Sequence, residues 1–166
     1  ETNPTVSSLS PADGAEGVAT TANLVITFDE AVDRESGNIT IKLDSDDSTV
    51  EAIDVTSGQV TGTGTTTITI DPTADLAEQT SYYVHIDATA FDDASSNTYA
   101  GISDATTWNF TSADETNPTV SSLSPADGAE GVATTANLVI TFDEAVDVES
   151  GNITIKLDSD DSTVEA

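Results

Sequence analysis

The sequence predicts an all-β protein, an antiparallel β-sandwich repeated in tandem along the chain. Short stretches of alternating apolar and polar residues recur through its 166 residues, as expected for strands with one buried face. Turn-rich stretches of Gly, Pro, Asp, Asn and Ser separate them, and no stretch keeps a helical apolar period for three turns. About seven short strands in one unit, with turns at this spacing, indicate a sandwich.

Each strand of the first unit is predicted by its own alternation. In chain order the strands are PTVSSLS (4–10), NLVITFD (23–29), NITIKLD (38–44), EAIDV (51–55), TTTITID (65–71), SYYVHID (81–87) and TTWNFTS (106–112), of which the first and fourth are the weakest. The residues that the alternation turns inward are Leu24, Ile26, Phe28, Ile39, Ile41, Leu43, Ile68, Ile70, Tyr82, Val84, Ile86, Trp108 and Phe110.

The charge balance limits the partners that the chain can have. It carries 31 Asp and Glu against 3 Lys and Arg, a formal net charge of −28. Such a surface repels nucleic acid and anionic lipid, so we expect neither as a partner. No apolar run approaches the roughly 18 residues of a membrane span, so direct membrane insertion is not expected. The chain opens without a signal peptide or initiator Met, which suggests a segment of a longer protein.

The second feature of the chain is a repeat of domain size. Residues 115–166 match residues 1–52 at every position but one, where Arg34 becomes Val148. The offset of 114 residues predicts a complete domain at 1–114 and the N-terminal half of a second, near-identical domain at 115–166. A second phase is open, with 1–52 as the half and 53–166 as a permuted complete unit. We expect a half-sandwich to be unstable alone, and to be completed by strand exchange or by a homodimer of identical halves.

Several motifs resemble a known family. They are SPADGAEGV at 10–18, TFDEAVD at 27–33, the Y-x-V-x-I strand at 82–86 and W-x-F at 108–110. Together they resemble the bacterial immunoglobulin-like repeat of the SbsA type, a cadherin-like module of large repetitive surface adhesins and S-layer proteins. The resemblance implies an immunoglobulin-like sandwich, and a secreted protein at the bacterial cell surface whose partners are adjacent repeats. One departure is Ser96, which stands where the family usually has Gly.

Acidic residues gather in the loops that an immunoglobulin-like strand order would bring together. That order places 29–38, 61–65 and 88–104 at one end with Glu1 (the top end), and 11–18, 43–49 and 71–79 at the other with Asp114 (the bottom end). Converging carboxylates favour a counter-ion, and Ca²⁺ suits an all-oxygen donor set in a chain with one His and no Cys. The predicted ligands, at the top ends and the domain junction, are Glu1, Asn3, Asp29, Glu30, Asp33, Asp92, Asp93, Asn97, Asp114, Glu115, Asn117, Asp143, Glu144 and Asp147.

These observations favour a structural function over catalysis. His85 is the one side chain that could act as a base at neutral pH, and it alternates onto an outer strand face without a nucleophile motif. We therefore expect no enzyme activity, and a spacer repeat of a surface adhesin made rigid by calcium. The alternative is a carbohydrate- or protein-binding module that uses the end loops, with Phe91 and Tyr99 as its exposed aromatics. An accessory domain of a secreted hydrolase is a third hypothesis.

Overall fold

The computed structural model describes residues 2–165, in two compact units, Glu1–Glu115 (unit 1) and Thr116–Ala166 (unit 2). The regular elements of the described residues are all β-strands, so the all-β prediction is confirmed. No helix in that range is long and apolar enough to cross a membrane. The strands of unit 1 are β1 (Val6–Ser10), β2 (Ala15–Val18), β3 (Leu24–Arg34), β4 (Asn38–Leu43), β5 (Thr49–Asp54), β6 (Val60–Thr61), β7 (Thr65–Ile70), β8 (Ser81–Ile86), β9 (Phe91–Asp92) and β10 (Asn109–Ser112).

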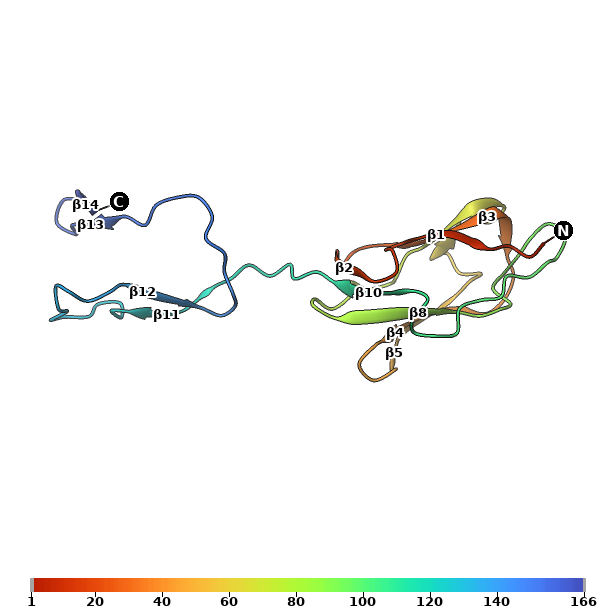
Figure 1. The fold of residues 1–166 in the computed structure, drawn as a ribbon, viewed down its shortest axis with the longest axis horizontal. Coiled ribbons are helices and arrows are strands. Elements are labelled where there is room, and N and C mark those ends of the chain that lie inside the picture. The colour runs from red at the N-terminus through yellow and green to blue at the C-terminus, as the bar shows by residue number, and fades with distance from the viewer. Residues whose placement is uncertain (1, 166) are drawn as a thin grey trace. The chain divides into compact units, whose positions relative to one another are not determined.

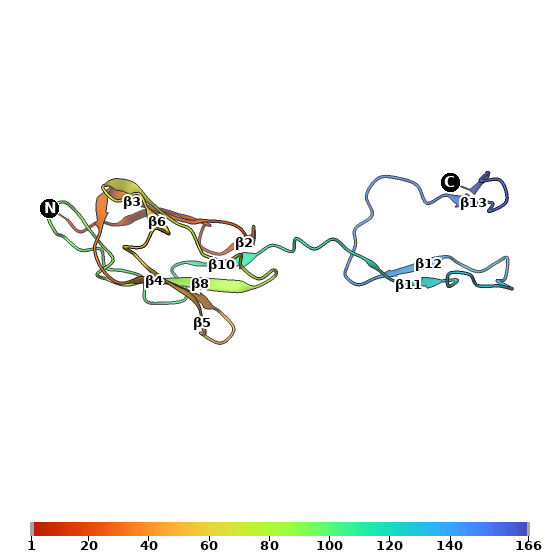
Figure 2. The same ribbon diagram turned by 180° about the vertical axis from the view of Figure 1, so that it is seen from behind.

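Unit 1 is a sandwich of two five-stranded sheets (Figure 1). One sheet has the order β1-β3-β7-β6, with β9 paired to the end of β3, and the other has the order β2-β10-β8-β4-β5. Both Figure 1 and Figure 2 show β3 in one layer and β8, β4 and β5 in the other. The predicted immunoglobulin-like sandwich is therefore the observed architecture of this unit.

The chain changes sheets between β1 and β2, where the structure corrects one prediction. We expected residues 11–18 to form a bottom-end loop, but Ala15–Val18 is strand β2, which pairs with β10 in parallel. The crossing is fixed by Asp13, whose Oδ1 accepts hydrogen bonds from the backbone N (3.0 Å) and Nδ2 (2.9 Å) of Asn109. Because β2 continues in the direction of β1 instead of turning back, it runs parallel to β10 and not antiparallel to it.

The predicted inward faces form the core of unit 1. Leu24 and Ile26 are 0% exposed and Phe28 is 2% exposed, and the inward residues of β7, β8 and β10 are equally buried. Leu43, predicted inward, is only partly buried, because it lies at the end of β4. Tyr82 also fixes the loop before β8, since its hydroxyl accepts a hydrogen bond from the backbone N of Ala77 at 2.9 Å.

Unit 2 repeats the strand pairs found in the first half of unit 1. It contains β11 (Val120–Ser124), β12 (Val139–Phe142), β13 (Ile155–Lys156) and β14 (Thr163–Glu165). The β11–β12 pair has the register of β1–β3, with Val120 opposite Phe142 as Val6 is opposite Phe28. The same local sequence thus gives the same local pairing in both units.

Candidate functional site

The loops predicted for the top end of unit 1 do gather there. The backbone N of Gly64 donates to the carbonyl of Val32 (2.8 Å), and that of Glu35 donates to the carbonyl of Ala90 (2.9 Å). The three loops are therefore joined through the end of β3. Of the two predicted ligands in the leading segment, Asn3 is exposed and Glu1 lies outside the described residues.

Asp29 closes the start of the chain onto β3. Its Oδ1 accepts from the backbone N of Thr5 and its Oδ2 from the Thr5 hydroxyl, both at 2.7 Å. These hydrogen bonds lower the pKa of Asp29 below its ordinary value. Both carboxylate oxygens of this predicted calcium ligand thus already accept hydrogen bonds within unit 1. Its neighbour Glu30 is half-buried.

Asp93 and Asn97 lie close together because they form hydrogen bonds with each other. The side chain of Asp93 is 5% exposed, and its Oδ1 accepts from the backbone N of Ser95 and of Asn97, each at 2.8 Å. Its Oδ2 accepts from Asn97 Nδ2 at 2.8 Å, and the hydrogen bonds from Asn97 lower the pKa of Asp93. Ser96 takes the left-handed conformation (φ 64°) that the family's Gly would favour, so the loop closes despite the substitution.

Asp33 and Asp92 form the pair of predicted ligands that the strand register places face to face. They are directly opposite each other in the antiparallel pair β3–β9. Opposed residues lie on one face with Cβ atoms about 5 Å apart, and like charges in that position destabilise the pair. Asp33 Oδ1 also accepts a hydrogen bond from the Thr63 hydroxyl at 3.1 Å. A cation bound between these two carboxylates would relieve that repulsion.

At the bottom end, the two acidic residues after β10 have partners in unit 1. Asp114 Oδ2 accepts from Gln79 Nε2 at 2.6 Å. Glu115 accepts from the hydroxyl (2.7 Å) and the backbone N (3.2 Å) of Thr20. These bonds fasten the end of the repeat to the loop after β2 and to the loop before β8.

Unit 2 repeats one of these arrangements. Asp143 accepts from the backbone N (2.7 Å) and hydroxyl (2.5 Å) of Thr119, and its pKa is lowered by those hydrogen bonds. Asn117 and Asp147 are exposed, and Glu144 is half-buried. Across residues 2–165, no group of three or more His, Asp or Glu side chains lies close enough to hold a metal ion by itself.

Other carboxylates have a structural role that the sequence reasoning missed. Asp104 accepts from the hydroxyl and backbone N of Thr106, and these bonds, with those from Thr107, lower its pKa to about 2. Asp54 binds Thr56 in the same way, and Asp46 binds the backbone N of Ser48. The recurring signal is an Asp two residues before Ser or Thr, which favours a turn closed by the side chain.

The aromatic residues of unit 1 are not available to a ligand. Phe91 is 0% and Tyr99 6% exposed, which corrects the expectation that they form an exposed cluster. Both rings pack on Phe28, at centroid distances of 5.6 Å and 5.1 Å. The loop folds back here because the backbone N of Tyr99 donates to the carbonyl of Phe91. His85 lies on the outer face of β8, with its ring 5.1 Å from that of Tyr83.

Two hollows in unit 1 are lined by polar loop residues. One lies beside Thr20, Asp71 and Asp75, and the other beside Asp44 and Gln79. Neither is lined by an aromatic side chain of the kind that commonly lines a ligand pocket. Sheet order, core and loops together define an immunoglobulin-like module.

Comparison with known proteins agrees with this class. The bacterial Ig-like domain family matches residues 1–112 and again residues 114–166, so the chain belongs to that family. No curated protein matches the chain. Among solved structures, the crystal structure of the S-layer protein rSbsC(31-844) matches with a TM-score of 0.43 and 17% identity over 71% of this chain. The match spans 15% of that S-layer chain.

Proposed function

We propose that the chain is a structural spacer repeat of a secreted or cell-surface bacterial adhesin. The observation that carries the proposal is the repetition of domain sequence, in which 115–166 copy 1–52 with one substitution. A spacer needs length rather than variety, so near-identical domains suit it. The bacterial Ig-like family supports a structural or binding module of this kind.

The described surface of unit 1 favours the spacer over the binding module. Its seven aromatic residues are all buried, and Tyr99, the most exposed of them, is 6% exposed. Sugar rings are commonly held against exposed aromatic faces, and protein-binding hot spots are rich in Trp and Tyr. A binding module would therefore need a recognition surface made almost wholly of Asp, Ser and Thr.

The proposal includes calcium at the ends of the repeats. Asp33 and Asp92 fit it best, because their opposed carboxylates supply oxygens and carry a repulsion that a divalent ion would remove. Asp29 and Asp93 fit less well, since hydrogen bonds from loop N–H and side-chain groups already engage their carboxylates. The other predicted ligands in the proposal are Asn3, Glu30, Asn97, Asp114, Glu115, Asn117, Asp143, Glu144 and Asp147.

A thermal melt tests the calcium proposal. Unit 1 is followed through Trp108, the single Trp of the chain, in excess EDTA and then with about millimolar calcium or magnesium, the range of extracellular modules. We expect calcium to raise the melting temperature and magnesium to raise it much less. Asp92→Asn should remove most of the increase, whereas Asp44→Asn, at the opposite end, should keep it. Equal melting temperatures in calcium and in EDTA would refute calcium binding. They would leave the spacer proposal unaffected.

The spacer itself is tested on the parent protein by electron microscopy. We expect its length to grow by a constant increment for every repeat added, and antibodies to locate the repeats on the cell surface. Specific binding of the chain to a glycan array would instead support the binding module.

A further inference from the structure

The first residues of the second repeat fold with the first repeat. The family match to the second repeat begins at residue 114, and Glu115 is the counterpart of Glu1 in the repeated sequence. Unit 1 nevertheless extends to Glu115, and unit 2 begins at Thr116. The boundary of the folded unit therefore lies inside the second repeat, after its leading acidic residues.

Backbone hydrogen bonds hold the chain beyond the end of β10. The backbone N of Ala113 donates to the carbonyl of Val18 at 2.7 Å, and the backbone N of Gln79 donates to the carbonyl of Ala113 at 3.1 Å. Val18 is the last residue of β2, and Gln79 lies in the loop before β8. Ala113 is therefore held on both sides, and the two side chains that follow it lie beside these same elements.

Those two side chains complete the attachment. Asp114 Oδ2 accepts a hydrogen bond from Gln79 Nε2 at 2.6 Å. Glu115 Oε2 accepts from the hydroxyl of Thr20 at 2.7 Å, and its Oε1 accepts from the backbone N of Thr20 at 3.2 Å. These three hydrogen bonds form a latch on the end of unit 1.

Thr20 is suited to receive a carboxylate. It is 8% exposed, and its carbonyl accepts from the backbone N of Leu76 at 2.9 Å, which fixes the loop after β2. A buried N–H or hydroxyl costs free energy when it has no acceptor, and a charged acceptor makes a stronger hydrogen bond than a neutral one. The carboxylate of Glu115 satisfies both donors of Thr20 at once.

We propose that Thr20 and Gln79 form a receptor site for the leading acidic segment of the following repeat, and that this latch fixes the direction in which the chain leaves each folded repeat. The partner is defined by its chemistry, as an extended segment with two adjacent carboxylates, here Asp114 and Glu115. The proposal rests on the proposed spacer function, because a following repeat exists only in an array.

The following repeat is fastened again soon after the latch. The backbone N and the hydroxyl of Thr119 both donate to Asp143. Three residues, 116–118, lie between the latch and this contact. Pro118 fixes its own φ and disfavours the helical conformation at Asn117. The latch thus limits the backbone freedom between repeats to a short segment.

Backbone order parameters from ¹⁵N relaxation of the full chain in EDTA test the latch. We expect the amides of Ala113, Asp114 and Glu115 to have values near the ~0.85 of rigid strands. Glu115→Ala should lower the values at 114 and 115 below about 0.6, because both hydrogen bonds to Thr20 are lost. Glu115→Gln keeps one acceptor oxygen and should retain part of the order.

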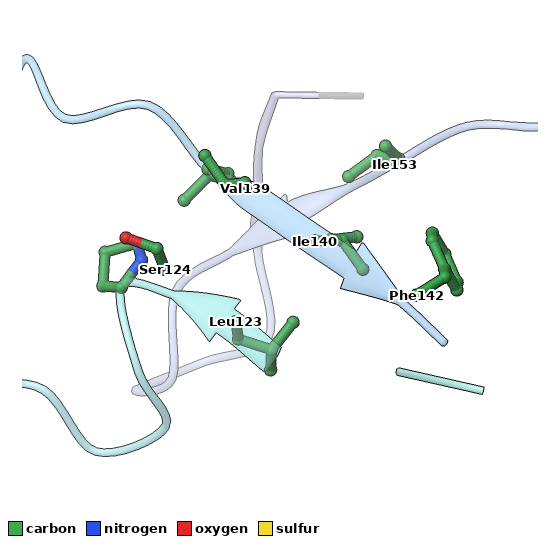
Figure 3. A pocket seen from close by; sticks show the side chains of 8 residues that line it. Leu123, Ser124, Val139, Ile140, Phe142 and Ile153 are labelled. Atoms are coloured by element: carbon green, nitrogen blue, oxygen red, sulfur yellow. The ribbon is translucent and has the colours of Figure 1, made fainter. Parts of the chain in front are cut away.

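The receptor side is tested with a matched pair of variants. Thr20→Val removes the hydroxyl that donates to Glu115 and should also lower the order at residue 115. The control is Thr134→Val, the same substitution at the counterpart position in unit 2. Thr134 is exposed, and it does not line the hollow of about 480 Å³ beside Ile140 that Figure 3 shows. The control should therefore leave the latch residues as ordered as before.

Three results would overturn the proposal. One is an order parameter below about 0.6 at Glu115 in the unaltered chain, or an unchanged value in both Glu115→Ala and Thr20→Val. Another is order at 113–115 that appears only with calcium, because the latch needs no ion. The third is loss of order together with unfolding of unit 1, since we expect the emission of the buried Trp108 to stay unchanged.

Failure of the latch and failure of the spacer can be told apart. The order parameters report on residues 113–115 of one chain, whereas the spacer is tested by the length of the parent protein. A flexible segment at 113–115 would leave a constant increment in length for each repeat, and would remove only the fixed direction between repeats.

Discussion

Replacing Phe28 by Ala should lower the free energy of unfolding of unit 1 by about 4 kcal/mol. Phe28 is 2% exposed and packs edge-on against Tyr99 and tilted against Phe91. A buried Phe removes at least about 150 Å² from water, worth about 4 kcal/mol at ~25 cal/mol per Å², and Phe→Ala changes in cores cost about 3–5 kcal/mol. Phe142→Ala is the matched control, because this residue has the same neighbours in sequence but lies half-buried in unit 2.

The assay is urea unfolding followed by Trp108 fluorescence. With an m value of about 2 kcal/mol per M, Phe28→Ala should lower the midpoint by about 2 M. Phe142→Ala should leave it unchanged, since Trp108 reports on unit 1. A loss below about 1 kcal/mol for Phe28→Ala, or an equal loss for both variants, would refute the assignment of Phe28 to the core.

Two further predictions concern hydrogen bonds. Lowered pKa values of Asp29, Asp93 and Asp104 mean that unfolding takes up protons, so this part of the stability is complete above about pH 4 and is lost as the pH falls towards about 2. The melting temperature should therefore fall as the pH is lowered across that window, and it should fall less steeply in Asp104→Asn. A melting temperature that does not change across the window would contradict this. Arg34→Val should cost unit 1 about 1–3 kcal/mol, because the carbonyls of Val55 and Ser57 lose a charged donor. Part of that loss is offset because Arg34 Nε is buried without a partner. Val148→Arg is the control in urea unfolding and should leave unit 1 unchanged; an equal effect of both would exclude the contacts of Arg34 as the cause.

The buried face of the sandwich could be predicted because it depends on the period of a strand. Leu24, Ile26 and Phe28 alternate with polar residues, and this pattern alone fixes which side faces the core. The sheet switch at Pro11–Gly14 could not be predicted in this way, since it depends on Asn109, which is distant in sequence. Turn residues indicate that the chain bends, but not whether it returns to the same sheet.

The acidic residues were harder to interpret than the apolar ones. Asp29 and Glu115 bind Thr5 and Thr20, partners that the sequence pattern does not connect to them. Asp104 with Thr106 is different, because a spacing of two residues is visible in the sequence and predicts a side-chain turn. A carboxylate-rich loop is thus compatible both with metal binding and with hydrogen bonds to its own backbone, and composition does not distinguish these two roles.

The parallel pairing of β2 with β10 determines how the domain would carry a mechanical load. β2 is pulled through β1 from the N-terminal side, and β10 is pulled from the C-terminal side, so the two neighbours are drawn in opposite directions along their length. The evenly spaced hydrogen bonds of a parallel pair are then sheared together and not opened one after another. A tethered chain of such domains would resist tension best along the line joining its two ends.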